Sequence, residues 1–124
     1  MRYILMTYQA PDHIEAWERS TPAERQLEID RTLAWFREHG TAGRIVGGEE
    51  LGYPPASRVV RGSGVSDGPF IESKELLGGF IVIDVPDEET ALMVASGWPG
   101  LEWPNDAIEV RAAGDSTAEG TGQG

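Results

Sequence analysis

The sequence contains no cysteine among its 124 residues. This absence excludes disulfides, thiolate metal sites and cysteine nucleophiles. Positive charge is also scarce, because 10 lysines and arginines stand against 21 acidic residues, which gives a formal net charge of −11. A charge of that sign opposes approach to nucleic-acid phosphates and to anionic membrane surfaces. We therefore expect neither nucleic acid nor membrane as a direct partner.

Long apolar runs are missing as well. A membrane-spanning helix needs about 18 apolar residues, and the apolar start at residues 4–6 is cut by Thr7, Gln9 and Pro11. The same interruption argues against a signal peptide. The expectation is a cytoplasmic protein with one domain, since a chain of this length leaves no room for a second.

What the sequence does contain is an alternation of strand and helix patterns. Strands are predicted at 2–8, 45–51, 58–61, 79–85 and 107–111. A hairpin is the simplest connection between 45–51 and 58–61. Helices are predicted at 22–39 and from residue 87 to about Gly97, and the final strand completes a β-α-β-β-α-β order in the α+β class.

The first predicted helix begins with a capping signature, Thr21 followed by a proline and then by a glutamate. Ile29, Leu33 and Phe36 are spaced to form one buried stripe. Leu27 and Trp35 lie off that stripe, and we interpret them as partner contacts. The second helix is predicted to bury three residues: Ala91, Leu92 and Ala95.

Strand 79–85 has two apolar faces. Ile81 and Ile83 lie on one face, and Phe80 and Val82 lie on the other. Strand 2–8 shows the same pattern. Two helices cover only one face of a sheet, so the other face must meet something else. We therefore predict a homodimer with the sheets facing one another.

The most distinctive block of the sequence is residues 67–79, which combine a turn, a charge cluster and a Gly-Gly step into an apolar strand. This block, together with residues 2–6, 47–51, 83–87 and 109–111, resembles the DGPF branch of the YCII-related proteins. The resemblance implies a ferredoxin-like sandwich over residues 1–112 that pairs into a dimeric α/β barrel, with an activity that is largely unassigned. Residues 113–124 have nothing to bury and are predicted to be a disordered, acidic, glycine-rich tail.

The resemblance also implies a catalytic dyad between a histidine of the first helix and an aspartate that precedes a proline. At the aligned position this chain has Trp98 before Pro99, and the helix predicted from Pro22 has no histidine up to Arg37. We therefore do not expect that dyad here.

The predicted catalytic residues are Asp67 and Glu72. If the two carboxylates converge on a cavity, their mutual repulsion raises one pKa and supplies a general acid or base. The alternatives are a turn-capping role for Asp67 and a solvated ion pair between Glu72 and Lys74.

Five further residues are predicted to bind a ligand: Arg61, Phe70, Lys74, Trp98 and Arg111. The two arginines, if they lie on neighbouring strands, can bind a carboxylate, or instead pair with Glu49 or Glu109 across strands. Trp98 belongs to one of two Trp-Pro pairs that either wall an apolar cavity or anchor a loop on the core.

The two histidines have both a functional and a structural interpretation. His13 lies between acids, where it can shuttle a proton, or it is a surface loop residue. His39 ends a helix, where a cation suits the dipole. The glycine-rich stretches at 43–48 and 62–68 lack the spacing of dinucleotide- and phosphate-binding loops. No cofactor and no metal are expected.

Two functional classes follow. The first is a small-molecule binder or proton-transfer enzyme with a cavity near the Asp67 loop. The second is a regulatory module, because relatives of this branch are often encoded beside extracytoplasmic-function sigma factors, and an acidic surface suits a basic partner.

Overall fold

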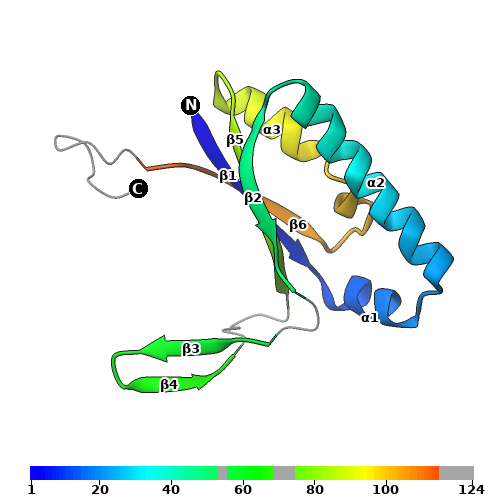
Figure 1. Ribbon diagram of the computed structural model, residues 1–124, viewed down its shortest axis with the longest axis vertical. Helices are drawn as coiled ribbons and strands as arrows, with labels where there is room; N and C mark the ends of the chain where they lie inside the picture. Colours follow the sequence, from blue (N-terminus) through cyan, green and yellow to red (C-terminus); the bar gives the residue numbers. More distant parts are fainter. Residues whose placement is uncertain (53–55, 69–74, 115–124) are drawn as a thin grey trace.

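The computed structural model describes residues 1–52, 56–68 and 75–114, and shows a mixed α+β fold (Figure 1). Four strands form an antiparallel sheet in the order β2-β5-β1-β6. Their bounds are Arg2–Gln9 for β1, Ile45–Glu50 for β2, Leu76–Asp84 for β5 and Ala107–Ala112 for β6. The predicted α+β class is confirmed.

Three α-helices and a short 3₁₀ helix accompany the sheet. Helix α1 spans Pro11–Arg19, α2 spans Pro22–Thr41, α3 spans Glu88–Ser96 and the 3₁₀ helix η1 spans Pro99–Glu102. Figure 1 shows α2 and α3 on one side of the sheet, with α1 near the end of β1. In the described part of the chain no helix is both long and apolar enough to cross a membrane.

The core lies between the sheet and the helices α2 and α3. Leu5, Ile83 and Val94 are its largest fully buried side chains. The Trp35 indole packs among them and donates a hydrogen bond of 3.2 Å from Nε1 to the Val94 carbonyl, which ties α2 to α3. Burial of side chains of this size is the main stabilising contribution in a domain this small.

This arrangement corrects the predicted burial of both helices. On α2 the buried positions are Trp35 and His39, whereas Ile29 and Leu33 are exposed. Trp35 therefore belongs to the core and is not a partner contact. The inward face of α2 runs through Glu28, Thr32 and Trp35, and Ile29 and Leu33 lie beside it. Phe36 is the member of the predicted stripe that packs against the core.

Helix α3 follows its prediction more closely. Ala91 and Ala95 are buried as expected, but Leu92 is exposed and Val94 takes its place in the core. The Asp87 side chain caps the helix by accepting a hydrogen bond of 2.8 Å from the backbone N–H of Thr90.

The predicted hairpin between 45–51 and 58–61 is wrong. Strand β2 pairs with β5, and β3 (Arg58–Arg61) pairs with β4 (Gly64–Asp67) in a separate two-stranded sheet. The segment 64–67 had no predicted strand, because its glycine and serine gave it the composition of a turn. Figure 1 shows this hairpin projecting away from the main sheet.

The face of the sheet opposite the helices is apolar and only half buried. Ile4 lies opposite Val82, and Met6 lies opposite Phe80, on adjacent strands. The two-sided apolar pattern predicted from the sequence is therefore present in the sheet. The dimer inferred from it stays a prediction.

Candidate functional site

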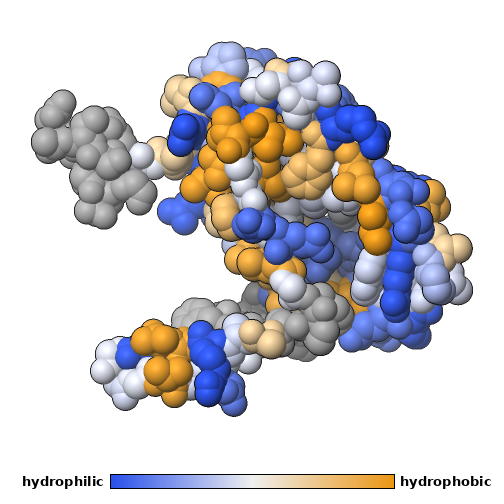
Figure 2. Space-filling model, viewed as in Figure 1, coloured by the Kyte–Doolittle hydropathy of each residue, from blue (hydrophilic) through white to orange (hydrophobic). Residues whose placement is uncertain are grey.

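A cleft of about 700 Å³ lies where the end of β1, the helices α1 and α2, and the segment from η1 to β6 meet. In Figure 2 the surface is hollowed between the sheet and the helices. Three tryptophans line this cleft, Trp17 from α1 and Trp98 and Trp103 from the segment after α3. Its wall therefore combines large aromatic surfaces with the polar groups described below.

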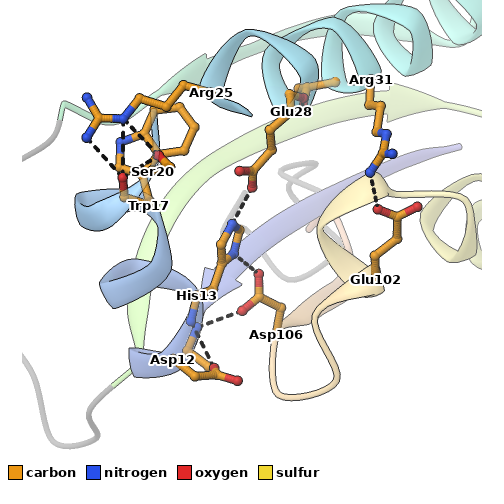
Figure 3. A network of polar contacts seen from close by, with 11 residues as sticks. Asp12, His13, Trp17, Ser20, Arg25, Glu28, Arg31, Glu102 and Asp106 are labelled. Atoms are coloured by element: carbon orange, nitrogen blue, oxygen red, sulfur yellow. Dashed lines mark hydrogen bonds and ion pairs between the residues drawn. The ribbon is translucent and has the colours of Figure 1, made fainter. Parts of the chain in front are cut away.

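His13 forms part of this wall, and both of its ring nitrogens contact carboxylates (Figure 3). Nδ1 lies 2.5 Å from Oδ2 of Asp106, and Nε2 contacts Oε1 of Glu28. The His13 side chain is only 5% exposed and that of Asp106 only 4%. Each contact needs a hydrogen atom on the histidine or on the carboxyl group, so a hydrogen bond at each nitrogen holds the ring between Asp106 and Glu28.

Asp106 fixes both the histidine and the turn that carries it. Its Oδ1 accepts a hydrogen bond of 2.8 Å from the backbone N–H of Ala10, the residue that precedes α1. With Oδ2 on His13, both carboxylate oxygens have partners. Asp106 therefore joins the loop before β6 to the start of α1, 93 residues away in sequence from the histidine.

Trp103 covers one face of the histidine ring. The two rings are stacked with their centroids 4.6 Å apart and an angle of 12° between their planes. Stacking leaves the His13 ring little freedom to rotate, so its two nitrogens stay aimed at the two carboxylates.

The corner between α1 and α2 is fixed by Arg25. Its guanidinium donates to the Trp17 carbonyl at 3.0 and 3.2 Å and to the Ser20 hydroxyl at 2.9 Å, and it also lies 5.4 Å from the centre of the Trp17 ring. These contacts hold the end of α1 against the first turn of α2 (Figure 3). They set the position of Trp17 in the cleft wall.

The capping box predicted at the start of α2 is present. Thr21 accepts from the Glu24 backbone N–H at 3.2 Å, and the Glu24 carboxylate accepts from the Thr21 backbone N–H at 2.8 Å. The hydrogen bond from the Thr21 backbone N–H to the Glu24 carboxylate, and after it the interaction with the Thr21 side chain, lower the pKa of the Glu24 carboxyl below its ordinary value. The cap fixes the first turn of α2 beside the cleft.

The structure corrects the interpretation of His13 as a surface loop residue. Residues 11–19 form helix α1, in which His13 is buried. Helix α1 thus brings a histidine to an aspartate, but Asp106 precedes Ala107 and not a proline, so this contact is not the dyad that the resemblance implies. A signal was available, since a proline at the helix start with an acidic residue in the first turn occurs in both helices, as Pro11 and Asp12 in α1 and as Pro22 and Glu24 in α2. The partner Asp106 had no local signal, because only the fold brings it to α1.

Asp67 lies elsewhere, at the end of β4 in the projecting hairpin. Its side chain is 90% exposed and accepts a hydrogen bond of 3.1 Å from Nε of Arg58 on the paired strand. With Ser57 and Arg58, Asp67 lines a second, shallower hollow. Its catalytic role stays a prediction.

Three of the other predicted site residues, Phe70, Glu72 and Lys74, lie outside the described residues. Arg61 and Arg111 do not lie on neighbouring strands as expected, because Arg61 is in β3 of the hairpin and Arg111 is in β6 of the main sheet. A shared carboxylate site for the two arginines therefore has no support from the strand order.

Trp98 fulfils both of its alternative interpretations. It packs edge-on against Trp35, with centroids 5.0 Å apart, and against Phe36 at 6.0 Å. It also lines the cleft. The residue thus links the core to the cleft wall.

Tyr8 stands at the end of β1 and donates a hydrogen bond of 3.2 Å to Glu109. Burial, followed by this contact with Glu109, raises the pKa of the Tyr8 hydroxyl above its ordinary value. For metals, the described parts of the chain contain no group of three or more histidine or acidic side chains placed to hold an ion.

A comparison with protein families places the chain in a known group. The YCII-related domain matches residues 1–113. The chain belongs to the YCII-related family. No curated protein matches this YCII-related chain. The family assignment agrees with the resemblance carried by residues 67–79 and the four other segments.

Proposed function

We propose that this YCII-related protein binds a small molecule in the cleft beside α1 and α2 and transfers a proton with His13. The observation that carries the proposal is the pair of carboxylates on the His13 ring, one of them buried, in the wall of a cleft large enough for a ligand. Asp106 orients the ring through Nδ1, and Nε2, which contacts the more exposed Glu28, is the nitrogen for proton transfer.

The Asp67 loop, where the sequence predicts the cavity, offers a weaker basis. A carboxylate that is 90% exposed works close to the dielectric of water, where neighbouring charges and hydrogen bonds tune a proton donor least. The buried His13 and Asp106 side chains work in a medium where the same interactions are stronger.

The four tryptophans provide the experiment for binding. Their indole N–H groups give separate NMR signals, and those of Trp17, Trp98 and Trp103 report on the cleft, whereas Trp35 lies in the core. A fragment screen should shift the three cleft signals far more than that of Trp35. A screen in which no fragment moves the cleft signals would contradict the proposal.

Proton transfer needs a second measurement on the fragments that bind. In D₂O, an acidic C–H of a bound fragment should exchange for deuterium in the presence of the protein. The variant His13→Gln should lose this exchange, because glutamine has no titrating group. The variant Asp67→Asn should retain the deuterium exchange. If the exchange were lost in Asp67→Asn and kept in His13→Gln, the proton-transfer group would be Asp67 in the hairpin.

We also propose that two copies pair through the open face of the sheet to form a dimeric α/β barrel of the ferredoxin-like type. The strand order β2-β5-β1-β6 and the half-buried Ile4, Met6, Phe80 and Val82 support this. Analytical ultracentrifugation at micromolar concentration tests it, and a monomer would overturn it. The alternative function, a module that acts with an extracytoplasmic-function sigma factor, stays a prediction supported by the acidic composition.

A further inference from the structure

The chain of contacts from Asp106 through His13 ends at Glu28, and this end is the accessible one. Asp106 and His13 expose 4% and 5% of their side chains, whereas Glu28 exposes 34%. Trp103 also covers one face of the His13 ring. A molecule in the cleft therefore meets the Glu28 carboxylate before it meets the imidazole.

The charges of the cleft wall favour a cation. The described lining residues include four carboxylates, which are those of Glu24, Glu28, Glu102 and Asp106. The basic side chains in the same lining are Arg19, Arg31 and His13.

Both arginines already have acidic partners. Arg31 lies 2.7 Å from Glu102, and Arg19 pairs with Glu15. The wall therefore carries a negative balance even with the imidazole charged, and the chain as a whole carries −11. That field draws cations toward the cleft and repels anions.

The aromatic wall suits the same class of ligand. A cation over the face of tryptophan is attracted by the ring quadrupole, and tryptophan is the best aromatic residue for this. The protein already uses this contact at the edge of the cleft, where the Arg25 guanidinium lies 5.4 Å from the centre of the Trp17 ring. Trp98 and Trp103 offer further aromatic surface to the apolar part of a ligand.

We propose that the cleft binds a small organic amine, with its ammonium group on Glu28 and its apolar body against the tryptophans. The proposal rests on the function proposed above and names the ligand class of that site. An ammonium on Glu28 competes with Nε2 of His13 for Oε1. In the proposed pose the ammonium takes Oε1 and not Oε2, so that Nε2 becomes accessible from the cleft.

Three probes with the same phenyl body test the charge preference: 2-phenylethylamine, 2-phenylethanol and 3-phenylpropanoate. Each is titrated against the full chain while the indole signals of the cleft tryptophans are followed. The amine should bind at least about tenfold more tightly than the alcohol. A charge-assisted hydrogen bond contributes more binding free energy than a neutral one, and the difference corresponds to about tenfold in affinity. The carboxylate should bind most weakly.

The variant Glu28→Gln should lower the affinity for the amine about tenfold and leave the alcohol unchanged. Its matched control is Glu49→Gln on β2, an exposed glutamate outside the cleft lining, which should change neither. An unchanged Trp35 signal shows that the variant is folded. A titration of the unmodified protein at raised salt concentration gives a second test. Salt should lower the affinity for the amine and leave the affinity for the alcohol unchanged.

Any of three outcomes would overturn the amine proposal. The amine and the alcohol could bind with equal affinity, the carboxylate could bind more tightly than the amine, or Glu28→Gln could lower the affinity for all three probes equally. In those cases the cleft still binds small molecules, so the proposed function stands. If no probe of any charge shifts the cleft tryptophans, the small-molecule function fails together with the amine proposal.

Discussion

The cleft around His13 and the hairpin that carries Asp67 both present a carboxylate to a basic side chain, but in opposite surroundings. In the cleft, Asp106 is 4% exposed and has partners on both oxygens. In the hairpin, Asp67 is 90% exposed and meets an Arg58 side chain that is itself 66% exposed. The difference lies in the number of elements that fix each group.

Elements distant in sequence converge on His13. Helix α1 carries it, α2 supplies Glu28, and the segment before β6 supplies Asp106 and Trp103. Asp67 is positioned by a single pair of strands. A group that several packed elements hold is preorganised, whereas a group on a two-stranded hairpin is positioned only by its neighbour strand. The two regions should therefore respond very differently to substitution.

The largest effect is expected for Asp106→Ala. The substitution leaves Nδ1 of His13 and the backbone N–H of Ala10 without their acceptor in a buried place. Loss of one partner from a buried charged pair costs about 3–5 kcal/mol. Urea unfolding followed by tryptophan fluorescence measures this free energy. Asp106→Asn keeps an acceptor and should cost less, and a loss below about 1 kcal/mol in the alanine variant would contradict the buried role.

A smaller effect is expected at the start of α2. Thr21→Ala removes the side chain that caps the helix beside the cleft, at a cost of about 1 kcal/mol in unfolding free energy. Thr21→Ser retains the hydroxyl and should behave as the unmodified protein. The pKa of Glu24 should also rise toward its ordinary value in the alanine variant, and carboxyl NMR titration detects this. An unaltered unfolding curve for the alanine variant would show that the cap does not stabilise this corner.

His39 is expected to make the stability of the protein depend on pH. Burial, which is partly offset by Glu38, lowers the pKa of His39, and the Arg44 guanidinium lowers it further. The unfolded chain therefore binds a proton more readily than the folded one. The contribution of His39 to stability is complete above its unfolded pKa of about 6.5 and is lost as the pH falls through the folded value.

The pH effect is measured as the free energy of unfolding of the unmodified protein and of His39→Gln between pH 8 and pH 5. Below about pH 6.5 the unmodified protein should lose stability faster than the variant. Parallel curves would contradict the lowered pKa. NMR titration of the His39 ring gives the direct control, with a midpoint below that of an exposed histidine.

The smallest effect is expected for Asp67→Asn. The exposed pair with Arg58 is screened by solvent, and substitutions at such surface positions change stability by at most about 0.5 kcal/mol. Unfolding in urea should give overlapping curves. A loss comparable to that of Asp106→Ala would show that the hairpin is packed against something in solution, and the comparison between the two regions would no longer hold.

Much of the fold was predictable from the sequence, because local rules determine it. The Thr21 cap, the α3 start after Asp87 and the strand before Pro86 all lie where turn chemistry and apolar pattern predict. The misassigned parts have competing local signals. Pro11 ends a strand and also begins a helix, and Gly64 has the composition of a turn although it begins β4.

The candidate site was less predictable, for a different reason. His13 was noticed as a histidine between acids, but its neighbours in sequence are not its principal partners. Asp12 bonds the His13 backbone, whereas the ring contacts Glu28 and Asp106. A residue pattern alone does not identify contacts between positions that far apart in the chain.

The sequence by itself determined the α+β class, the family, the acidic character and the two apolar faces of the sheet. The class, the acidic character and the apolar faces follow from composition or from periodicity along a single segment, whereas the family follows from the resemblance of five short segments. Only the tertiary structure decided that His13 is buried and which carboxylates its ring meets. Side-chain partners depend on how β1, α2 and β6 pack together, and that packing sets long-range distances that local sequence does not encode. The distinctive block at 67–79 carries the family resemblance, whereas the buried contact between His13 and Asp106 joins segments that lie elsewhere in the sequence.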